Sequence, residues 1–303
     1  MSKRLRKFGC GIDFSFVPPY NGTRMKEHLK DKRENDLQYE KMRDAAERFI
    51  AERYVSDGFY MHFHRNVELY CVCRGEVIVT VNGESKVLTD GQMALISGLE
   101  SHSYEVDENA DIAYFHIGTK YMAPFKKLYG KKVPARWLLD AEYNEKNIYP
   151  VVEKVMRDGD GMTELECVCY GNLALARIVN KYGFNKNCEK NTGGGKITDI
   201  IQYIYDNSDS DLNLGILAKK FGYAPQVLSR KISSCIDVDL RVFINDVRAQ
   251  KVMLMRNDEK YKDLSLMEIA SRCGFNSVAT FYRSYNRNFR YSSLHGEKKE
   301  PKE

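Results

Sequence analysis

The chain has 303 residues, which at roughly 100–200 residues per domain predicts about two domains. Hydrophobic residues make up 43% and charged residues 29%, a balance that excludes a wholly disordered chain, a collagen and a multi-span membrane protein. No apolar run approaches the roughly 18 residues that a membrane helix needs, so we expect no membrane association. The basic start, Lys3–Lys7, is followed by Asp13 and Pro18-Pro19 before an apolar stretch of roughly 7–15 residues can form. We therefore expect no signal peptide and a cytoplasmic location.

The net charge of +5 is compatible with a nucleic-acid partner without requiring one. The eight cysteines are scattered along the chain, which favours reduced thiols over a disulfide framework. The pairs Cys71/Cys73 and Cys167/Cys169 lack the two-residue spacing of zinc knuckles, so we expect neither to bind a metal.

The first half begins irregularly and then predicts a helix from about Asp36 to Tyr54, capping the domain that follows. Short strands come next, with Asn82-Gly83 as the strongest hairpin signal. The expected strands lie within 60–74, 76–81, 86–88, 93–96 and 112–117. Many short strands separated by turn residues indicate a barrel or a jelly roll.

Two amphipathic helices are predicted after the strands, at Glu145–Arg157 and Leu165–Tyr182. They have three possible roles: packing on the barrel, pairing with a second chain, or both. The polar, glycine-rich stretch that follows is the one clear linker in the sequence. We therefore expect a domain at 1–187, a linker at 188–196 and a second domain at 197–303.

The second half reads as helices throughout. Leu214–Phe221, a break at Gly222 and a helix from Pro225 form a helix-turn-helix pattern, and a longer helix follows at Leu240–Met255. The pattern then returns: Leu217-Ala218 and Phe221-Gly222-Tyr223 align with Ile269-Ala270 and Cys273-Gly274-Phe275. A repeat of about 52 residues is far more specific than either copy alone.

The segment from about Lys196 to Leu294 resembles the DNA-binding domain of the AraC/XylS transcription regulators. The resemblance rests on Ile269-Ala270, Gly274-Phe275-Asn276-Ser277, Phe281, Arg283 and Tyr285, and on Phe243-Ile244-Asn245 before Arg248. Two positions depart from the family pattern: Tyr285-Asn286 stands where Phe-Lys is usual, and Ser292-Ser293 where Thr-Pro is usual. The resemblance implies a bacterial regulator, with activation through contact with RNA polymerase.

Burial of the apolar positions leaves one face of each second helix free to read bases. On these faces Arg suits guanine, Gln suits adenine, and Ala and Thr suit the thymine methyl. The candidate DNA-binding residues are Gln226, Ser229, Arg230, Lys231, Ala279, Thr280, Arg283 and Arg287, with Lys231 and Arg287 assigned to phosphates. A solvated surface charge is the alternative for each arginine, but the shared register of Arg230 and Arg283 favours base contact.

The sequence His62-Phe63-His64, then Glu68, Gly75 and later His102, resembles a cupin barrel from about Gly58 to Gly118. The second cupin motif is degraded, with Ser97, Leu99 and Val106 replacing its usual residues. Strand alternation places positions 62, 64, 68 and 70 on one face and Cys71 and Cys73 on the other. The candidate effector-binding residues are therefore His62, His64, Glu68, Tyr70 and His102.

Three roles for this pocket remain open. It could hold Fe(II), Mn(II) or Zn(II), it could bind a small effector without metal, or its histidines could be hydrogen-bonded with no ligand. Our interpretation takes the second role and assigns no cofactor, no metal and no catalytic residue.

We interpret the chain as an α+β protein: an N-terminal cupin-like β-barrel with flanking helices, and a C-terminal all-α domain with two helix-turn-helix units. It is expected to be a transcription regulator, an activator by the resemblance, and not an enzyme. Its expected partners are double-stranded DNA, a small polar effector such as a sugar, RNA polymerase and a second copy of the chain. The alternatives are a metal-dependent cupin oxygenase or isomerase with a helical appendage, and a regulator that responds to no ligand.

Overall fold

The computed structural model describes residues 37–40, 43–44, 48–106, 109–185, 196–236 and 238–289. The chain divides near residue 199 into two compact units, one within 34–199 and the other within 200–303. Apart from Lys196, which begins a helix, the linker predicted at 188–196 lies outside the described residues, so its bounds stay a prediction.

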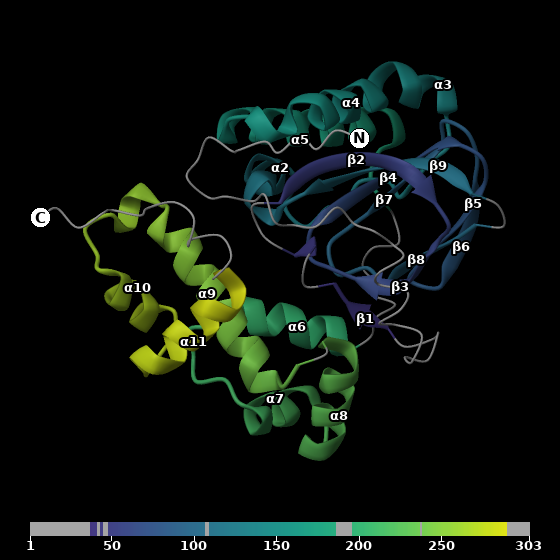
Figure 1. The fold of residues 1–303 in the computed structure, drawn as a ribbon. Helices are drawn as coiled ribbons and strands as arrows, with labels where there is room; N and C mark the ends of the chain where they lie inside the picture. Colours follow the sequence, from purple (N-terminus) through teal and green to yellow (C-terminus); the bar gives the residue numbers. More distant parts are fainter. Residues whose placement is uncertain are drawn as a thin grey trace, which may run out of the picture. The chain divides into compact units, whose positions relative to one another are not determined.

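The first unit is built on two five-stranded sheets (Figure 1). One has the order β1-β3-β8-β5-β6 and the other β10-β7-β4-β9-β2. The strands are β1 (Gln38–Tyr39), β2 (Phe49–Ser56), β3 (Phe59–Phe63), β4 (Val67–Arg74), β5 (Val77–Val81), β6 (Glu84–Leu88), β7 (Met93–Ile96), β8 (His102–Glu105), β9 (Ala110–Ile117) and β10 (Trp137–Leu138). Side chains from both sheets form one interior cluster, so the sheets enclose a common core, here called the barrel. The predicted α+β class and cupin-like barrel are confirmed.

Strand alternation separates two environments along β4. Tyr70 and Val72 belong to the interior cluster, whereas Leu69 and Cys71 belong to a second cluster between the sheet and the helices. Because successive side chains of a strand point to opposite faces, one strand serves both clusters. Cys71 therefore lies in packing, as the alternation predicts.

The Asn82-Gly83 turn is a hairpin, as predicted. It joins β5 to β6, with Val81 paired to Glu84. Both turn residues have positive φ, 52° at Asn82 and 80° at Gly83. This is the backbone that a two-residue type I′ turn requires, and Asn and Gly are the residues that adopt it most easily.

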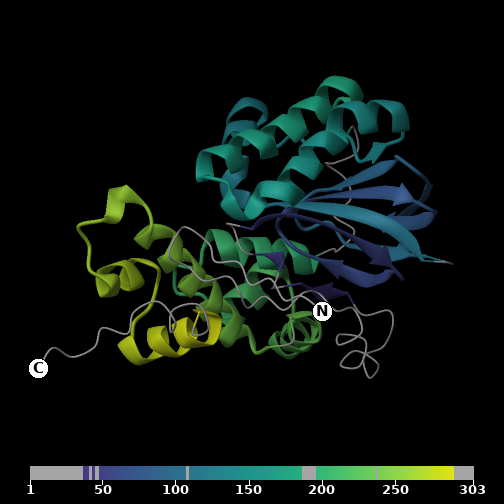
Figure 2. The ribbon, with the colours of Figure 1, turned by 45° about the horizontal axis from the view of Figure 1, so that its top comes forward.

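Helices cover the outer face of the β4-containing sheet (Figures 1 and 2). They are α2 (Ala123–Tyr129), α3 (Ala141–Tyr143), a π-helical turn (Asn144–Ile148), α4 (Tyr149–Asp158) and α5 (Glu164–Tyr182). Thr163 and Glu166 form a capping box that starts α5 by satisfying its first backbone N–H groups. Val152 of α4 and Leu175 and Ile178 of α5 are fully buried against the sheet. The apolar stripes of both predicted helices are thus used in packing on the barrel.

The helix predicted from Asp36 to Tyr54 is wrong. Its described residues form the short strand β1 and the strand β2, which pairs antiparallel with β9 from Phe49↔Ile117 to Ser56↔Ala110. Phe49 and Ala51 pack toward the helices, while Ile50 and Tyr54 pack toward the barrel interior. Apolar residues on both faces hide the period of two, and the pairing with β9 is not visible locally.

The described residues of the second unit form helices (Figure 1). These are α6 (Lys196–Asp206), α7 (Leu214–Phe221), α8 (Pro225–Ile236), α9 (Leu240–Arg256), α10 (Leu266–Arg272) and α11 (Val278–Phe289), with a 3₁₀ turn at Glu259–Tyr261. The long helix α9 packs on α8 as well as on α10 and α11. It therefore connects the two helix-turn-helix units. In the part of the chain that the structure describes, no helix has the length and apolar character needed to cross a membrane.

The turns of the two helix-turn-helix units each contain the same backbone hydrogen bond, at positions 52 residues apart along the chain. The N–H of Tyr223 donates to the carbonyl of Ala218 at 2.9 Å, and the N–H of Phe275 donates to that of Ala270 at 3.1 Å. Gly222 and Gly274 supply the positive φ between them, 70° and 91°. The second turn is one residue longer before its next helix begins, so α8 and α11 correspond at an offset of 53 residues.

The two turn glycines should differ in their tolerance of a side chain. A Cβ at Gly222 would contact nothing, whereas one at Gly274 would lie 2.9 Å from the carbonyl oxygens of Ser208 and Asp209. We expect Gly222→Ala to lower the free energy of unfolding by about 1 kcal/mol through its positive φ alone. Gly274→Ala should cost about 2–4 kcal/mol because backbone must also move. Urea unfolding followed by helical circular dichroism measures both, and equal losses would contradict the steric argument.

Candidate functional site

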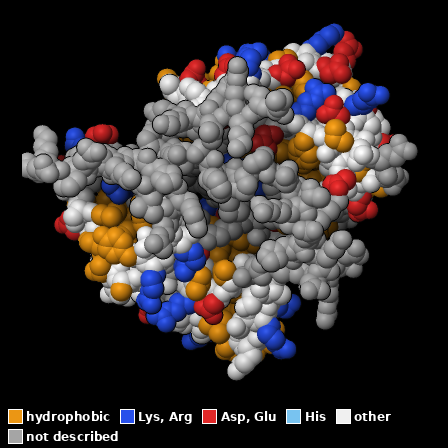
Figure 3. Space-filling model, viewed as in Figure 1, with side chains coloured by type: hydrophobic (Ala, Val, Ile, Leu, Met, Phe, Trp, Pro, Cys, Tyr) orange, Lys and Arg blue, Asp and Glu red, His pale blue; other side chains and the backbone are white. Residues whose placement is uncertain are grey.

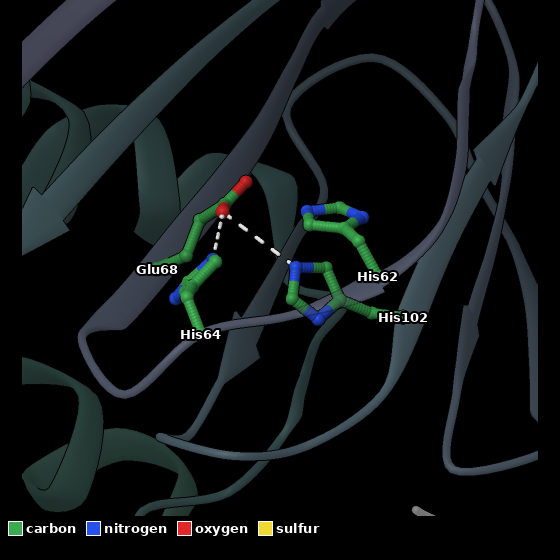
Figure 4. A group of neighbouring side chains, drawn as sticks. All are labelled: His62, His64, Glu68 and His102. Carbon is green, nitrogen blue, oxygen red and sulfur yellow. Dashed lines mark hydrogen bonds and ion pairs between the residues drawn. The ribbon is translucent and has the colours of Figure 1, made fainter. Parts of the chain in front are cut away.

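A cluster of ionisable side chains lies inside the barrel, centred on Glu68 of β4 (Figure 4). His62 comes from β3, His64 from the segment just after β3, and His102 from the start of β8. All four side chains are buried, with at most 1% exposed. The Glu68 carboxylate oxygen Oε2 lies 2.9 Å from Nε2 of His64 and 3.7 Å from Nε2 of His102. The structure thus brings together four of the five predicted effector-binding residues.

Backbone carbonyls orient the three histidines. Nδ1 of His62, His64 and His102 lies 2.9, 3.0 and 2.8 Å from the carbonyl oxygens of Tyr60, Asn66 and Glu100, respectively. Because a carbonyl only accepts, each Nδ1 carries the proton and donates it. In the neutral rings, Nε2 then presents a lone pair, and in His64 and His102 this atom is directed at Glu68.

Tyr70, the fifth predicted residue, also points into the barrel. Its ring stacks on that of Tyr104, with centroids 3.8 Å apart and planes at 11°. The hydroxyl of Tyr104 donates to Oε1 of Glu68 at 2.8 Å. The hydroxyl of Tyr70 is buried without a hydrogen-bond partner among the described residues, and so is Nε2 of His102. Buried polar atoms are rarely left without a partner, so both atoms could form hydrogen bonds with a ligand or a water molecule.

Sequence reasoning missed two residues of this cluster, His116 and Arg43. His116 of β9 pairs with Glu68 across the sheet, and its Nε2 lies 2.8 Å from Oε2 of that carboxylate. In β9, Ile112 and Tyr114 point into the barrel, and the alternation of side chains along a strand would have placed His116 on the same inward face. Arg43 lies in a segment predicted as helix, and its Nη1 is 3.4 Å from Oε2 of Glu68. Nothing in the local pattern marks that contact.

Burial and neighbouring charges set the protonation of the cluster. Burial lowers the pKa of His62 and His116 well below the ordinary value and that of His64 to about 4, so these rings are neutral near pH 7. Burial alone would raise the pKa of Glu68, but its interactions with His116, His102 and His64 hold that pKa well below its ordinary value. The centre of the barrel is therefore an ionised carboxylate among neutral imidazoles.

These residues could hold a metal ion. His62, His64, Glu68 and His102 each offer one ligand atom, and the four atoms lie within 4.8 Å of one another. Three imidazole nitrogens and one carboxylate oxygen suit Zn(II), Fe(II) or Mn(II). The same groups can hydrogen-bond the hydroxyls of a small polar molecule. The cysteine pairs are not part of this cluster.

The first predicted DNA-reading face lies on α8. Gln226, Arg230 and Lys231 are exposed and Ser229 is half-buried, while Leu228 and Ile232 are buried. Arg230 makes no hydrogen bond or ion pair with the described residues. Figure 3 shows lysine and arginine side chains on the surface of this unit in one view. The arginine is thus available to a partner.

The second face lies on α11 and repeats this arrangement at the offset of 53 residues. Arg283 corresponds to Arg230, and the buried Phe281 corresponds to Leu228. Ala279 is exposed, and Thr280 is half-buried and accepts a hydrogen bond of 3.3 Å from Arg283. Val278 and Tyr282 are 55% and 45% exposed on the same helix, and neither is among the predicted DNA-binding residues.

Arg287 is placed differently from the other basic candidates. Its guanidinium forms an ion pair with Asp246 of α9, a carboxylate that is only 1% exposed. Asn288 donates to the same Asp246 oxygen at 2.9 Å. This network fixes α11 to α9. The assignment of Arg287 to a phosphate stays a prediction, alongside this structural contact.

Comparisons with known proteins cover both units. Residues 44–120 match the family model described as the AraC-like ligand binding domain. The chain is similar to the HTH-type transcriptional activator RhaS of Escherichia coli, with 22% identity over 256 residues, 80% of this chain and 89% of that protein. RhaS of Shigella sonnei is 21% identical over the same coverage. Among solved structures, unsaturated fatty acid-bound ToxT of Vibrio cholerae is similar at 13% identity and a TM-score of 0.38, covering 84% of this chain and 98% of that one.

The Asp246 network predicts a difference between two arginine substitutions. Arg287→Ala removes the guanidinium partner of a buried carboxylate, so we expect the free energy of unfolding to fall by about 1–3 kcal/mol. Arg230→Ala, the matched control on the exposed face of α8, should change it by less than about 0.5 kcal/mol. Urea unfolding of both variants checks this. If Arg287→Ala costs the same with Asp246→Asn as without it, the ion pair is not the cause.

Proposed function

We propose that the chain, which is similar to regulators of the AraC family, controls transcription by binding duplex DNA under the influence of a small molecule held in its barrel. The C-terminal helices would bind DNA and the N-terminal barrel would bind the effector. Its matched relatives carry the name of a transcriptional activator, which supports regulation over catalysis.

One observation carries the DNA-binding proposal: two helix-turn-helix units present an arginine at the same position. Each unit has the equivalent hydrogen bond in its turn, and in each the residue two positions before the arginine, Leu228 or Phe281, is buried. A duplicated reading helix suits two successive major grooves, whose centres are roughly 34 Å apart along B-DNA. Gln226 would contact adenine, Arg230 and Arg283 guanine, and Ala279 or Thr280 the thymine methyl.

The charge of the second domain supports base readout as a main source of affinity. From Lys196 onward the sequence has 18 lysines and arginines against 14 aspartates and glutamates. Such a small excess provides modest attraction to phosphates. Specific contacts from the two exposed arginines would then supply much of the binding free energy.

The two arginines are expected to specify different halves of the DNA site. Arg230→Ala should weaken specific binding about ten- to a hundred-fold and relax base preference at one position, because a bidentate contact to guanine contributes about 1–3 kcal/mol. Arg283→Ala should do the same about ten base pairs away. A selection of bound sequences from a random DNA pool, made with the full-length protein and each variant, measures both preferences.

Lys231→Ala is the matched control for that selection. Lys231 is exposed beside Arg230 on α8 and is assigned to a phosphate, so its loss should weaken binding to all sequences alike and reduce the salt dependence. Retention of the wild-type preference at every position by both arginine variants would rule out the proposed reading faces.

A small polar effector in the barrel is supported by the hydroxyl of Tyr70 and Nε2 of His102, which find no hydrogen-bond partner in the described part of the chain. Nε2 of His102 lies 3.7 Å from the Glu68 carboxylate, and the ring of Tyr70 stacks on that of Tyr104, whose hydroxyl donates to Glu68. Hydroxyl groups of a ligand would find an acceptor in this carboxylate as well. A sugar is one class of molecule with this chemistry. The fatty acid named for ToxT belongs to that protein and does not define the effector here.

We also propose that the chain forms a homodimer through α4 and α5, two of the helices that cover the barrel. Ile178, which the sequence pattern places on the same apolar stripe as Leu173, is fully buried against the sheet and is not available for this contact. The exposed positions of α5 include Leu165, Cys169, Leu173 and Ala176. Their spacing of three or four residues places them along one side of the helix.

Leu165→Lys combined with Leu173→Lys should therefore give monomers, because two charges would be buried in the interface. Leu165 is 71% and Leu173 38% exposed, so the unfolding temperature of the monomer should change little. Leu128→Lys on α2, where the side chain is 75% exposed, is the control and should leave the dimer intact. Sedimentation at micromolar concentration measures the state. A monomeric wild type would exclude the proposal.

The remaining elements of the proposal follow from regulation of transcription. A bacterial regulator that binds chromosomal DNA works in the cytoplasm, and activation would require contact with RNA polymerase. The alternative of a cupin oxygenase or isomerase gains no support from the relatives, which carry names of regulators. We therefore propose no catalytic activity.

A further inference from the structure

We propose that a side-chain latch formed by Glu84, Arg136 and Trp137 closes the barrel between the end strands β6 and β10, and that this seam opens to admit small molecules to the interior. The opening is a property of the barrel and does not depend on the proposed function. Only the identification of the admitted molecule as the effector rests on that function.

The polar groups inside the barrel are closed off from solvent in the part of the chain that the structure describes. His62, His64 and His102 are at most 1% exposed. A molecule that reaches them must pass through the barrel wall, so part of the wall has to move. The wall is expected to open most easily where no backbone hydrogen bonds join neighbouring strands.

Such a place lies where the two sheets meet at β6 and β10. The strand β6 is the last of one sheet and pairs with β5, and β10 is the last of the other and pairs with β7. No backbone hydrogen bond joins the described residues of β6 to those of β10. Side chains alone therefore close this seam.

Glu84 of β6 is the centre of the latch. Its Oε1 accepts a hydrogen bond of 2.7 Å from Nε1 of Trp137, and its Oε2 forms an ion pair of 2.9 Å with Nη1 of Arg136. Lys86 of the same strand lies over the Trp137 ring, with Nζ 5.9 Å from the ring centroid. Trp137 also packs against the apolar cluster of the interior. Side chains of β6 thus hold the indole as a cover over the interior.

Arg136 connects the latch to the interior of the barrel. Its Nη2 lies 2.5 Å from Oε1 of Glu100, and the backbone carbonyl of Glu100 accepts the Nδ1 proton of His102 at 2.8 Å. A molecule bound beside His102 and a movement of Arg136 would therefore act on the same residue. The Nε–H of Arg136 is buried without a hydrogen-bond partner among the described residues. This unsatisfied donor favours opening, because water could then accept its hydrogen bond.

Opening this seam should need less free energy than opening the barrel between β1 and β2, the other end strands of the sheets. On that side the buried guanidinium of Arg43 lies over the rings of Phe59 and Tyr114, 4.6 and 5.9 Å from their centroids. The side chain of Glu84 is 60% exposed, so water can replace its partners as they separate. Exposed ion pairs contribute little to stability, whereas breaking the contacts of a buried charge is costly.

The test measures access to the barrel interior of the full-length protein with diethyl pyrocarbonate, a small reagent that acylates an unprotonated imidazole nitrogen. His62, His64 and His102 donate their Nδ1 protons to carbonyls, so Nε2 is the atom that would react. Glu84→Ala removes both acceptors of the latch. It should raise the acylation rate of these three histidines about ten-fold, as measured by mass spectrometry of their peptides.

Glu105→Ala is the matched control. Glu105 is an exposed glutamate at the end of β8 in the same sheet, and it makes no hydrogen bond or ion pair with the described residues. Its loss should leave the acylation rate unchanged. Low urea concentrations should also leave the rate of Glu84→Ala unchanged, because local opening exposes much less surface than global unfolding.

Three results of this experiment would overturn the latch. One is an equal acylation rate in Glu84→Ala and the wild type, and another is an equal rise in Glu105→Ala. The third is a rate in Glu84→Ala that rises with urea as global unfolding does, because the histidines would then react only in the unfolded chain.

Trp137 provides a second readout, because it is the one tryptophan in the sequence. Acrylamide should quench its fluorescence about twice as strongly in Glu84→Ala as in the wild type, because the latch no longer holds the indole. Sodium chloride at about 1 M should screen the ion pair of Glu84 with Arg136 and increase quenching in the wild type but not in Glu84→Ala. An equal salt effect in both proteins would contradict the role of this ion pair in the latch.

DNA binding distinguishes this inference from the proposed function. A barrel that opens at this seam in a protein without specific DNA binding would leave the latch standing and remove the regulator proposal. Specific DNA binding by a protein in which Glu84→Ala and the wild type are acylated equally would do the reverse.

Discussion

The barrel is organised around a single buried carboxylate, Glu68, because an ionised group in a low-dielectric interior must be compensated by its neighbours. His64, His116 and the hydroxyl of Tyr104 contact its two oxygens at 2.8–2.9 Å, and Arg43 lies slightly farther away. These groups come from several strands of both sheets and from the segment before β2. The carboxylate therefore links parts of the chain that are distant in sequence and fixes the centre of the pocket.

The same strands that supply this polar centre also supply the apolar contacts that hold the helices. In β4, Glu68 and Tyr70 point inward while Leu69 and Cys71 pack against the outer layer. A change in the packing of α4 or α5 therefore acts on the strand that carries Glu68. This arrangement offers a short physical route from the pocket to the helical surface proposed for dimerisation.

The second unit uses one buried carboxylate in a comparable way. Asp246 of α9 holds Arg287 and Asn288 of α11, while Arg248 of α9 donates to the carbonyls of Ser208 and Ser210. The long helix α9 is thus tied to α11 and to the loop before α7. These contacts help to set the relative placement of α8 and α11, on which the spacing of the two proposed reading faces along DNA would depend.

Local patterns in the sequence determined most of the elements: the Asn82-Gly83 hairpin, the helix Leu214–Phe221, the repeated glycine turns and the inward face shared by His62, Glu68 and Tyr70. Each depends on residues a few positions apart, where turn chemistry and periodicity act. Only the tertiary structure decided that 49–56 is a strand, that His116 and Arg43 reach Glu68, and that Arg287 pairs with Asp246. These contacts join residues 25 to 68 positions apart, and their energy comes from burial and charge pairing that no local window contains.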